Sequence, residues 1–304
     1  MPNPVLPIEL LSDIIRHLDD NYFSLFNCLF VNRAWCKATV PILYRSPLAL
    51  YQRRSVPPTT SSPKQDLAYM PIDTYLASLP ASMREAFPDL KEKFPNEFKP
   101  LFNYYSYLEY LSDEALFNSV INSFDTAAVP VALTEYAGIY AALLFMFINE
   151  AKRLKTLDLV CMFRTELILQ QSERWPIGNL GHTRGLVSLT VSVPGLTDIN
   201  PKAKHLQSHG QIADIILNQK RIKVIKLKIF GKVSHVIMDT LLQKRNTLEV
   251  IRFVRCNFDD YPLEEWKSKL GNVALEFIRC HNIPDSKSVD RTSYTMSMRS
   301  YPLR

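Results

Sequence analysis

Few residues of this chain stand at spacings that support catalysis or metal binding. His205 and His209 lie four residues apart, which places two imidazoles on one face of a helix, as in some zinc sites. No glutamate of an HExxH pattern accompanies them and no third ligand lies nearby in the sequence, so we expect no metal site. Cys280 directly precedes His281, which is not a ligand spacing, and we interpret Cys280 as a core position.

Loops that bind phosphate or present a nucleophile are also missing from the sequence. The segment Gly181–Gly185 reads GHTRG and lacks the central serine or cysteine of a nucleophile elbow. Neither GxGxxG nor Gly-Lys-Ser/Thr occurs. Acidic residues cluster at the start of an expected helix, where the helix dipole favours them: Asp259, Asp260, Glu264 and Glu265. We therefore expect a non-catalytic protein with no cofactor and no bound metal.

Composition indicates an ordinary globular protein in a reducing compartment. The 304 residues are 47% hydrophobic, carry a net charge of +6, and suggest about two domains or one domain with an elongated array. Five scattered cysteines with apolar neighbours favour the cytoplasm, the nucleus or both, and the N-terminal residues do not resemble a secretory signal. The apolar run 137–148 is shorter than the roughly 20 residues of a membrane span, so it predicts a buried helix instead.

Residues 6–47 predict three short helices with more apolar surface than they can bury alone. Leu10, Ile14 and Leu18 recur every four residues, and Asn32 is placed to cap the third helix. A unit of this size buries only a limited share of its apolar surface. The surplus must pack against the rest of this chain or against a partner protein, and the apolar faces alone do not distinguish these alternatives.

The order of these residues resembles the F-box family. The matching elements are Leu6-Pro7-x-Glu9-Leu10-Leu11, then Ile14 and Leu18, then Leu25, Cys28 and Val31-Asn32-Arg33-x-Trp35, then Leu43-Tyr44. Tyr44 stands where the family commonly has tryptophan. The resemblance implies docking onto a Skp-type adaptor, which bridges to a cullin scaffold carrying a ubiquitin-transferring RING ligase. Carried over position by position, the adaptor-binding residues are Leu6, Pro7, Glu9, Leu10, Ile14, Leu18, Leu25, Val31 and Trp35.

A second pattern repeats in the C-terminal half. Its four copies start 26–36 residues apart: Leu154-x-x-Leu157-x-Leu159, Leu186-x-x-Leu189-x-Val191, Ile222-x-x-Ile225-x-Leu227 and Leu248-x-x-Ile251-x-Phe253. A weaker fifth copy centres on Leu275 and Phe277. Amphipathic stretches between the later copies predict helices at 212–218, 236–244 and 263–270. Short strand, turn and helix at this period resemble a leucine-rich-repeat array. The resemblance implies an α/β fold, in which the three-helix F-box precedes an irregular solenoid of parallel strands with outer helices.

Composition and pattern together predict five segments. They are an F-box at 1–47, a Pro/Ser/Thr-rich linker at 48–70, a helical and extended joining region at 71–150 with a possible first repeat at 104–124, the repeat array at 151–283, and a tail or cap at 284–304.

In the array the leucines point inward, so the alternate residues form an outward row along a concave face. This candidate substrate-binding row is Asp158, Thr190, Lys226, Arg252 and Glu276. Residues 202–245 add ten Lys/Arg against two Asp/Glu, a local charge of +8 that attracts an acidic or phosphorylated segment or a nucleic-acid backbone. The alternative for both features is a solvated surface.

These expectations describe a substrate-recognition subunit of an SCF-type E3 ubiquitin ligase. Its F-box docks the adaptor, its repeats bind an unknown protein target, and it contributes proximity rather than chemistry. We expect neither a membrane nor a nucleic acid as partner. The alternatives are a non-catalytic scaffold or nucleic-acid-associated repeat protein outside a ubiquitin ligase, and an enzyme with an unrecognised site in 66–150.

Overall fold

The structure is a computed structural model that describes most of the predicted F-box segment and most of the predicted repeat array. The described residues are 6–19, 21–48, 70–79, 100–125, 133–160, 185–193, 201–259 and 261–281. Residues 49–69 of the predicted linker and the whole predicted tail at 284–304 lie outside this set, as does Cys161.

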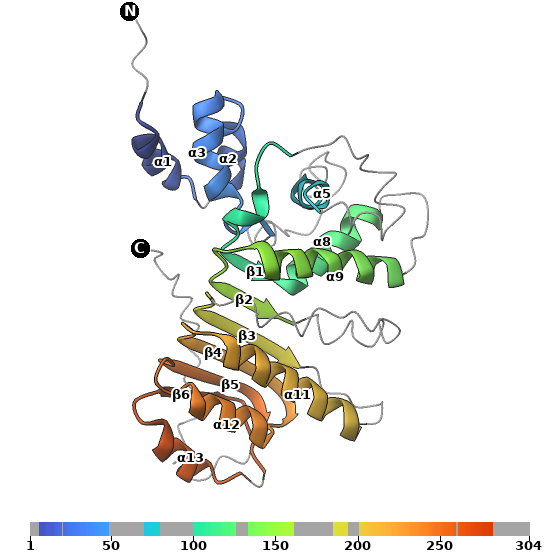
Figure 1. The fold of residues 1–304 in the computed structure, drawn as a ribbon, viewed down its shortest axis with the longest axis vertical. Coiled ribbons are helices and arrows are strands. Elements are labelled where there is room, and N and C mark those ends of the chain that lie inside the picture. Colours follow the sequence, from blue (N-terminus) through green and yellow to red (C-terminus); the bar gives the residue numbers. More distant parts are fainter. Residues whose placement is uncertain are drawn as a thin grey trace, which may run out of the picture.

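The protein is an α/β protein built on a six-stranded parallel sheet. The strands are β1 (Tyr110–Ser112), β2 (Thr156–Leu159), β3 (Ser188–Val193), β4 (Val224–Lys232), β5 (Val250–Asn257) and β6 (Ala274–Ile278). Their spatial order is the same as their order in the chain, as Figure 1 shows. Parallel neighbours need long crossover connections, and helices lie in several of these connections. They are α8 (Asp113–Asp125), α9 (Leu133–Glu150), α11 (Pro201–Asn218), α12 (His235–Gln243) and α13 (Leu263–Leu270).

The inward side chains of one face of the sheet are part of the main hydrophobic core. The second apolar position of each repeat, from Leu157 through Leu189 and Ile225 to Ile251, is completely buried and in register with the next strand. Side chains of the helices complete this core. Trp266 of α13 is the largest of the fully buried side chains, and its Nε1–H donates to the backbone carbonyl of Met238 at 3.0 Å.

The apolar run 137–148 lies within α9, where Tyr140, Leu143 and Phe147 are completely buried. The prediction of a buried helix is therefore confirmed. Among the described residues, no helix combines the length and apolar character that crossing a bilayer requires.

Three helices form a separate N-terminal unit, which we call the helical unit: α1 (Ile8–Arg16), α2 (Tyr22–Cys28) and α3 (Arg33–Leu43). It has its own small core, centred on Leu11, Ile15 and Leu25. Asn32 caps α3 as predicted, because its side-chain oxygen accepts hydrogen bonds from the N–H groups of Ala34 and Trp35.

In the chain, helix α5 (Met70–Ala77) and the 3-10 turn η2 (Tyr104–Tyr107) follow the helical unit and precede the sheet. Strand β1 precedes the first copy of the repeat pattern and pairs with β2, and helix α8 follows β1. The possible first repeat at 104–124 therefore contains a strand and a helix, but its first residues form the 3-10 turn rather than a strand.

A backbone ladder joins the helical unit to the sheet. The carbonyl of Arg45, just after α3, accepts hydrogen bonds from the N–H groups of Glu109 and Tyr110 at 2.9 and 3.2 Å. The carbonyl of Glu109 accepts from Lys155 and Thr156 in the same way. The pattern continues along the starts of the later strands, where the accepting residues are Lys155, Val187 and Lys223, with Glu249 accepting one bond from Ala274. The ladder thus begins at the end of the helical unit.

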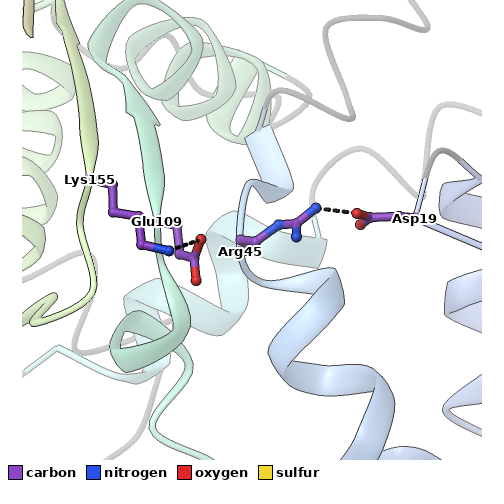
Figure 2. Close-up of polar contacts among 4 residues, drawn as sticks. All are labelled: Asp19, Arg45, Glu109 and Lys155. Carbon is purple, nitrogen blue, oxygen red and sulfur yellow. Dashed lines mark hydrogen bonds and ion pairs between the residues drawn. The ribbon is translucent and has the colours of Figure 1, made fainter. Parts of the chain in front are cut away.

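Side chains reinforce the first rungs of this ladder, as Figure 2 shows. Arg45 forms an ion pair with Asp19, which follows α1, and both side chains are about three-quarters buried. Lys155 forms an ion pair with Glu109 at 2.9 Å on the neighbouring rung. The ion pair of Arg45 therefore connects the turn after α1 to the residue on which the sheet ladder starts.

Candidate docking surfaces

Helix α1 has two apolar faces, and only one of them is buried. Leu11 and Ile15 are 1% and 0% exposed and pack in the core of the helical unit. Their neighbours Leu10 and Ile14 are 53% and 46% exposed. Because successive helical residues are turned by about 100°, the two adjacent stripes point in different directions. The stripe of Leu10 and Ile14 faces away from the core.

Other large apolar side chains of the helical unit are exposed as well. We define the apolar helical surface as Leu6, Ile8, Leu10, Ile14, Phe23, Phe30 and Val31, which are 43–72% exposed. In the part of the chain that the structure describes, three further large hydrophobic side chains are exposed, Leu101, Leu217 and Val236. Scattered exposed hydrophobics are normal, but a concentration on one small unit indicates an interaction surface.

The nine predicted adaptor-binding residues separate into three groups. Leu6, Pro7, Glu9, Leu10, Ile14 and Val31 are exposed. Leu18 and Trp35 are half-buried and pack against the core of the helical unit. Leu25 is completely buried in that core, so it stabilises the unit and cannot contact a partner directly, contrary to its predicted position.

The prediction also left out three exposed residues, Ile8, Phe23 and Phe30. Residues 22–31, which include Phe23 and Phe30, are apolar nearly all round in the sequence, so the pattern does not identify which of them are exposed. Phe30 contacts the ring of Phe26 edge-on at 5.2 Å and is the most exposed residue of the apolar helical surface.

Later parts of the chain contact the helical unit at one end. Tyr44, after α3, packs against Tyr75 and Tyr104, with ring centroids 5.8 and 4.4 Å away. Its side chain packs against both hydrophobic cores. Figure 1 shows α1 at the left edge of the helical unit, with α2 and α3 on the side toward α5. Among the described residues, α5 and η2 therefore contact the C-terminal end of α3, and the apolar helical surface stays exposed.

The outward face of the sheet is the second candidate surface. The strand register aligns Asp158, Thr190, Lys226, Arg252 and Glu276 in one row, so the predicted alignment is confirmed. Its two ends carry polar contacts between neighbouring strands. Asp158 accepts a hydrogen bond from the Tyr110 hydroxyl at 2.9 Å, and Arg252 donates to both carboxylate oxygens of Glu276 at 2.6 and 3.3 Å.

The basic residues of 202–245 do not form one surface. Lys223 lies on a strand-start rung and pairs with Glu249 at 2.6 Å. Lys244 lies after α12 and donates to the carbonyl of Gln219, while burial lowers the pKa of its ammonium group. Lys226 and Lys228 remain on the outward face of β4.

The residues considered for chemistry are dispersed. His209 is buried, and the side chain of His205 lies outside the described residues, as does the segment 181–184. Glu264 and Glu265 lie in the first turn of α13 and form ion pairs with Lys267 and Lys269. In the described ranges, no three His, Cys, Asp or Glu side chains come together as a metal site.

Two cysteines in equivalent positions of adjacent repeats affect each other. Cys256 is buried, and Cys280 is half-buried against the main core, which confirms its interpretation as a core position. A hydrogen bond from the Cys256 thiol lowers the pKa of Cys280 to about 7, despite the opposing effect of burial. The same interaction raises the pKa of Cys256.

In comparisons with known proteins, no family model, curated protein or solved structure matches this chain.

Proposed function

We propose that this chain is the substrate-recognition subunit of an SCF-type ubiquitin ligase, with an F-box at 1–47 and a leucine-rich-repeat-like array that includes β1 to β6. The helical unit docks a Skp-type adaptor, which connects it to a cullin scaffold. The outward face of the sheet binds the protein target. The chain itself holds the target close to the ligase and performs no chemistry.

The observation that carries this proposal is the apolar helical surface. A three-helix unit that has its own core nevertheless exposes seven large apolar side chains, and the described remainder of the chain contacts a different end of the unit. Exposure of this much apolar surface is unfavourable in water, and a helical partner would remove it from water. Four of the seven exposed residues, Leu6, Leu10, Ile14 and Val31, are also positions of the resemblance to the F-box family.

The backbone ladder supports a receptor function for the two surfaces together. The ladder and the Arg45–Asp19 ion pair fix the helical unit to the first strand. A target bound to the sheet is then held in a defined orientation relative to an adaptor bound to the helical unit. Orientation of this kind is what proximity-based transfer requires.

Co-purification with a Skp-type adaptor tests the proposal. Leu10→Asp combined with Ile14→Asp places two charges on the exposed stripe of α1, and we expect adaptor co-purification to be lost. The matched control is Leu217→Asp with Val236→Asp, which alters two exposed apolar residues of α11 and α12 outside the helical unit. We expect this control to retain the adaptor.

The wild-type chain must bind the adaptor and bring a cullin with it for the proposal to stand. Absence of adaptor from the wild-type sample would refute it, as would equal binding by the wild type and the α1 variant. Circular dichroism of each variant establishes that the helices are retained.

A further inference from the structure

The outward face of the sheet changes in charge between its two halves. The outward residues of β1, β2 and β3 include no lysine or arginine, whereas β4 and β5 carry several cations on this face. We define the basic strand patch as Lys226, Lys228, Phe230 and Arg255. All four side chains are exposed or half-buried.

The cations of this patch have no acidic partner within the described part of the chain. Arg252, in the neighbouring position, is neutralised by Glu276 through two hydrogen bonds. Lys226 lies beside Arg252 in the strand register and has no such carboxylate. Lys226 and Lys228 follow each other on one face of β4, so their like charges repel each other and attract an anion.

A β-bulge brings two of the cations to one aromatic ring. The register of β4 and β5 shifts between Lys228 and Gly231, so that two residues of β4 oppose Arg255. Bulges re-aim side chains, and here the Arg255 guanidinium lies 5.2 Å from the centroid of the Phe230 ring. The ammonium group of Lys228 lies 5.3 Å from the same centroid. The ring thus holds two cations in place by cation–π contact, which reduces the entropy that binding must remove.

From this arrangement we infer that the basic strand patch binds an extended, carboxylate-rich segment of a protein. The inference deepens the proposed function by assigning a chemical class to the target. Lys226 and Lys228 are two residues apart on one strand face, so they are about 7 Å apart along the strand. Alternate side chains of an extended segment have the same spacing. A segment with acidic residues at alternate positions therefore presents one carboxylate to each lysine.

A nucleic acid fits the patch less well than a protein segment does. Base stacking needs a free aromatic face, but Phe230 is the aromatic residue of this patch and two cations contact its ring.

Direct binding to the purified full chain tests the inference without the adaptor. The probe is a fluorescein-labelled heptapeptide of alternating glutamate and valine, and binding is measured by fluorescence anisotropy. Three comparison probes are the same peptide with glutamine for glutamate, the same peptide with phosphoserine for glutamate, and a single-stranded RNA dodecamer. We expect the glutamate peptide to bind at least tenfold more tightly than the glutamine peptide and the RNA.

Charge reversal locates the site. Lys226→Glu with Lys228→Glu is expected to weaken binding of the glutamate peptide at least tenfold. The matched control, Lys220→Glu with Arg221→Glu, reverses two exposed cations that precede β4 and is expected to change binding less than twofold. The milder pair Lys226→Gln with Lys228→Gln gives an intermediate loss and checks that the effect does not come from misfolding.

Several results would overturn the inference: binding of no peptide, equal loss in the control variant, tighter binding of RNA, or at least tenfold tighter binding of the phosphoserine peptide. The adaptor assay separates this outcome from the proposed function. A chain that binds the adaptor but not the glutamate peptide refutes the target class alone, whereas a chain that binds the peptide but not the adaptor refutes the ligase assignment.

Discussion

Two adjacent isoleucines of α1 provide the sharpest test of the apolar helical surface. Ile14 is 46% exposed and Ile15 is completely buried, although the residue type and the helix are the same. Ile15→Ala removes buried methyl and methylene groups and leaves a cavity, which costs about 2–4 kcal/mol of unfolding free energy. Ile14→Ala removes partly exposed groups, and the higher helix propensity of alanine offsets part of the loss, so the expected change is below about 0.5 kcal/mol.

Hydrogen–deuterium exchange of the α1 and α3 amides measures this difference locally, and urea unfolding followed by circular dichroism measures it for the whole chain. Adaptor binding should show the opposite order. A buried interface anchor is worth about 2 kcal/mol, so Ile14→Ala is expected to weaken adaptor binding by about 30-fold. The neighbouring pair Leu10 and Leu11, at 53% and 1% exposure, provides an independent repeat of the experiment.

Equal destabilisation by Ile14→Ala and Ile15→Ala would refute the reasoning, because it would mean that this chain itself covers Ile14. The proposed docking surface would then be part of the protein's own core.

Three further predictions concern the array and its junction. Trp266→Ala removes the largest buried side chain and its hydrogen bond to Met238, and urea unfolding should show a loss of about 3–5 kcal/mol; a loss below 1 kcal/mol would contradict the burial. The Cys280 thiol, with a pKa of about 7 instead of its ordinary value near 9, becomes the reactive thiolate as the pH rises through 7. Its alkylation by iodoacetamide should therefore accelerate from pH 6 and level off near pH 8, while buried Cys256 stays unmodified. Mass spectrometry of the peptides measures both sites, and a rate at Cys280 that still rises steeply above pH 8 would contradict the lowered pKa. Asp19→Ala removes a mostly buried ion pair at the junction, and we expect a stability loss of about 1 kcal/mol by urea unfolding and faster amide exchange at the start of β1; unchanged exchange would show that the backbone ladder alone fixes the junction.

The array was the most predictable part of the chain. Its phrase repeats at period two within each strand, so the inward position of Leu157 and the outward position of Asp158 follow from the pattern. Helix α13 has the predicted bounds, Leu263–Leu270, because its apolar positions are clearly periodic. Helix α11 begins earlier than the predicted residue 212, since the polar residues of its first half provide no apolar periodicity.

The docking residues were harder to predict because α1 carries two adjacent apolar stripes. The period of 3.6 residues identifies both stripes equally, and packing against α3 determines that Leu11 is inside and Leu10 outside. Leu25 was assigned to the adaptor interface although it is buried, because residues 22–31 are apolar on nearly every side in the sequence. The role of Arg45 had no sequence signal, since its carbonyl makes the first rung of the ladder and every residue has a carbonyl.

The strands follow one another in space in the same order as in the chain. The number of strand–helix copies therefore sets the distance between the helical unit and a given strand. Neighbouring strands are about 4.8 Å apart, so the four steps from the Arg45 rung to β4 span about 19 Å. Removal of one strand–helix copy would shorten this spacer by about 5 Å, while every remaining rung would keep a partner of the same kind. Gain or loss of copies can therefore adjust how far a captured segment is held from the helices without redesign of either end.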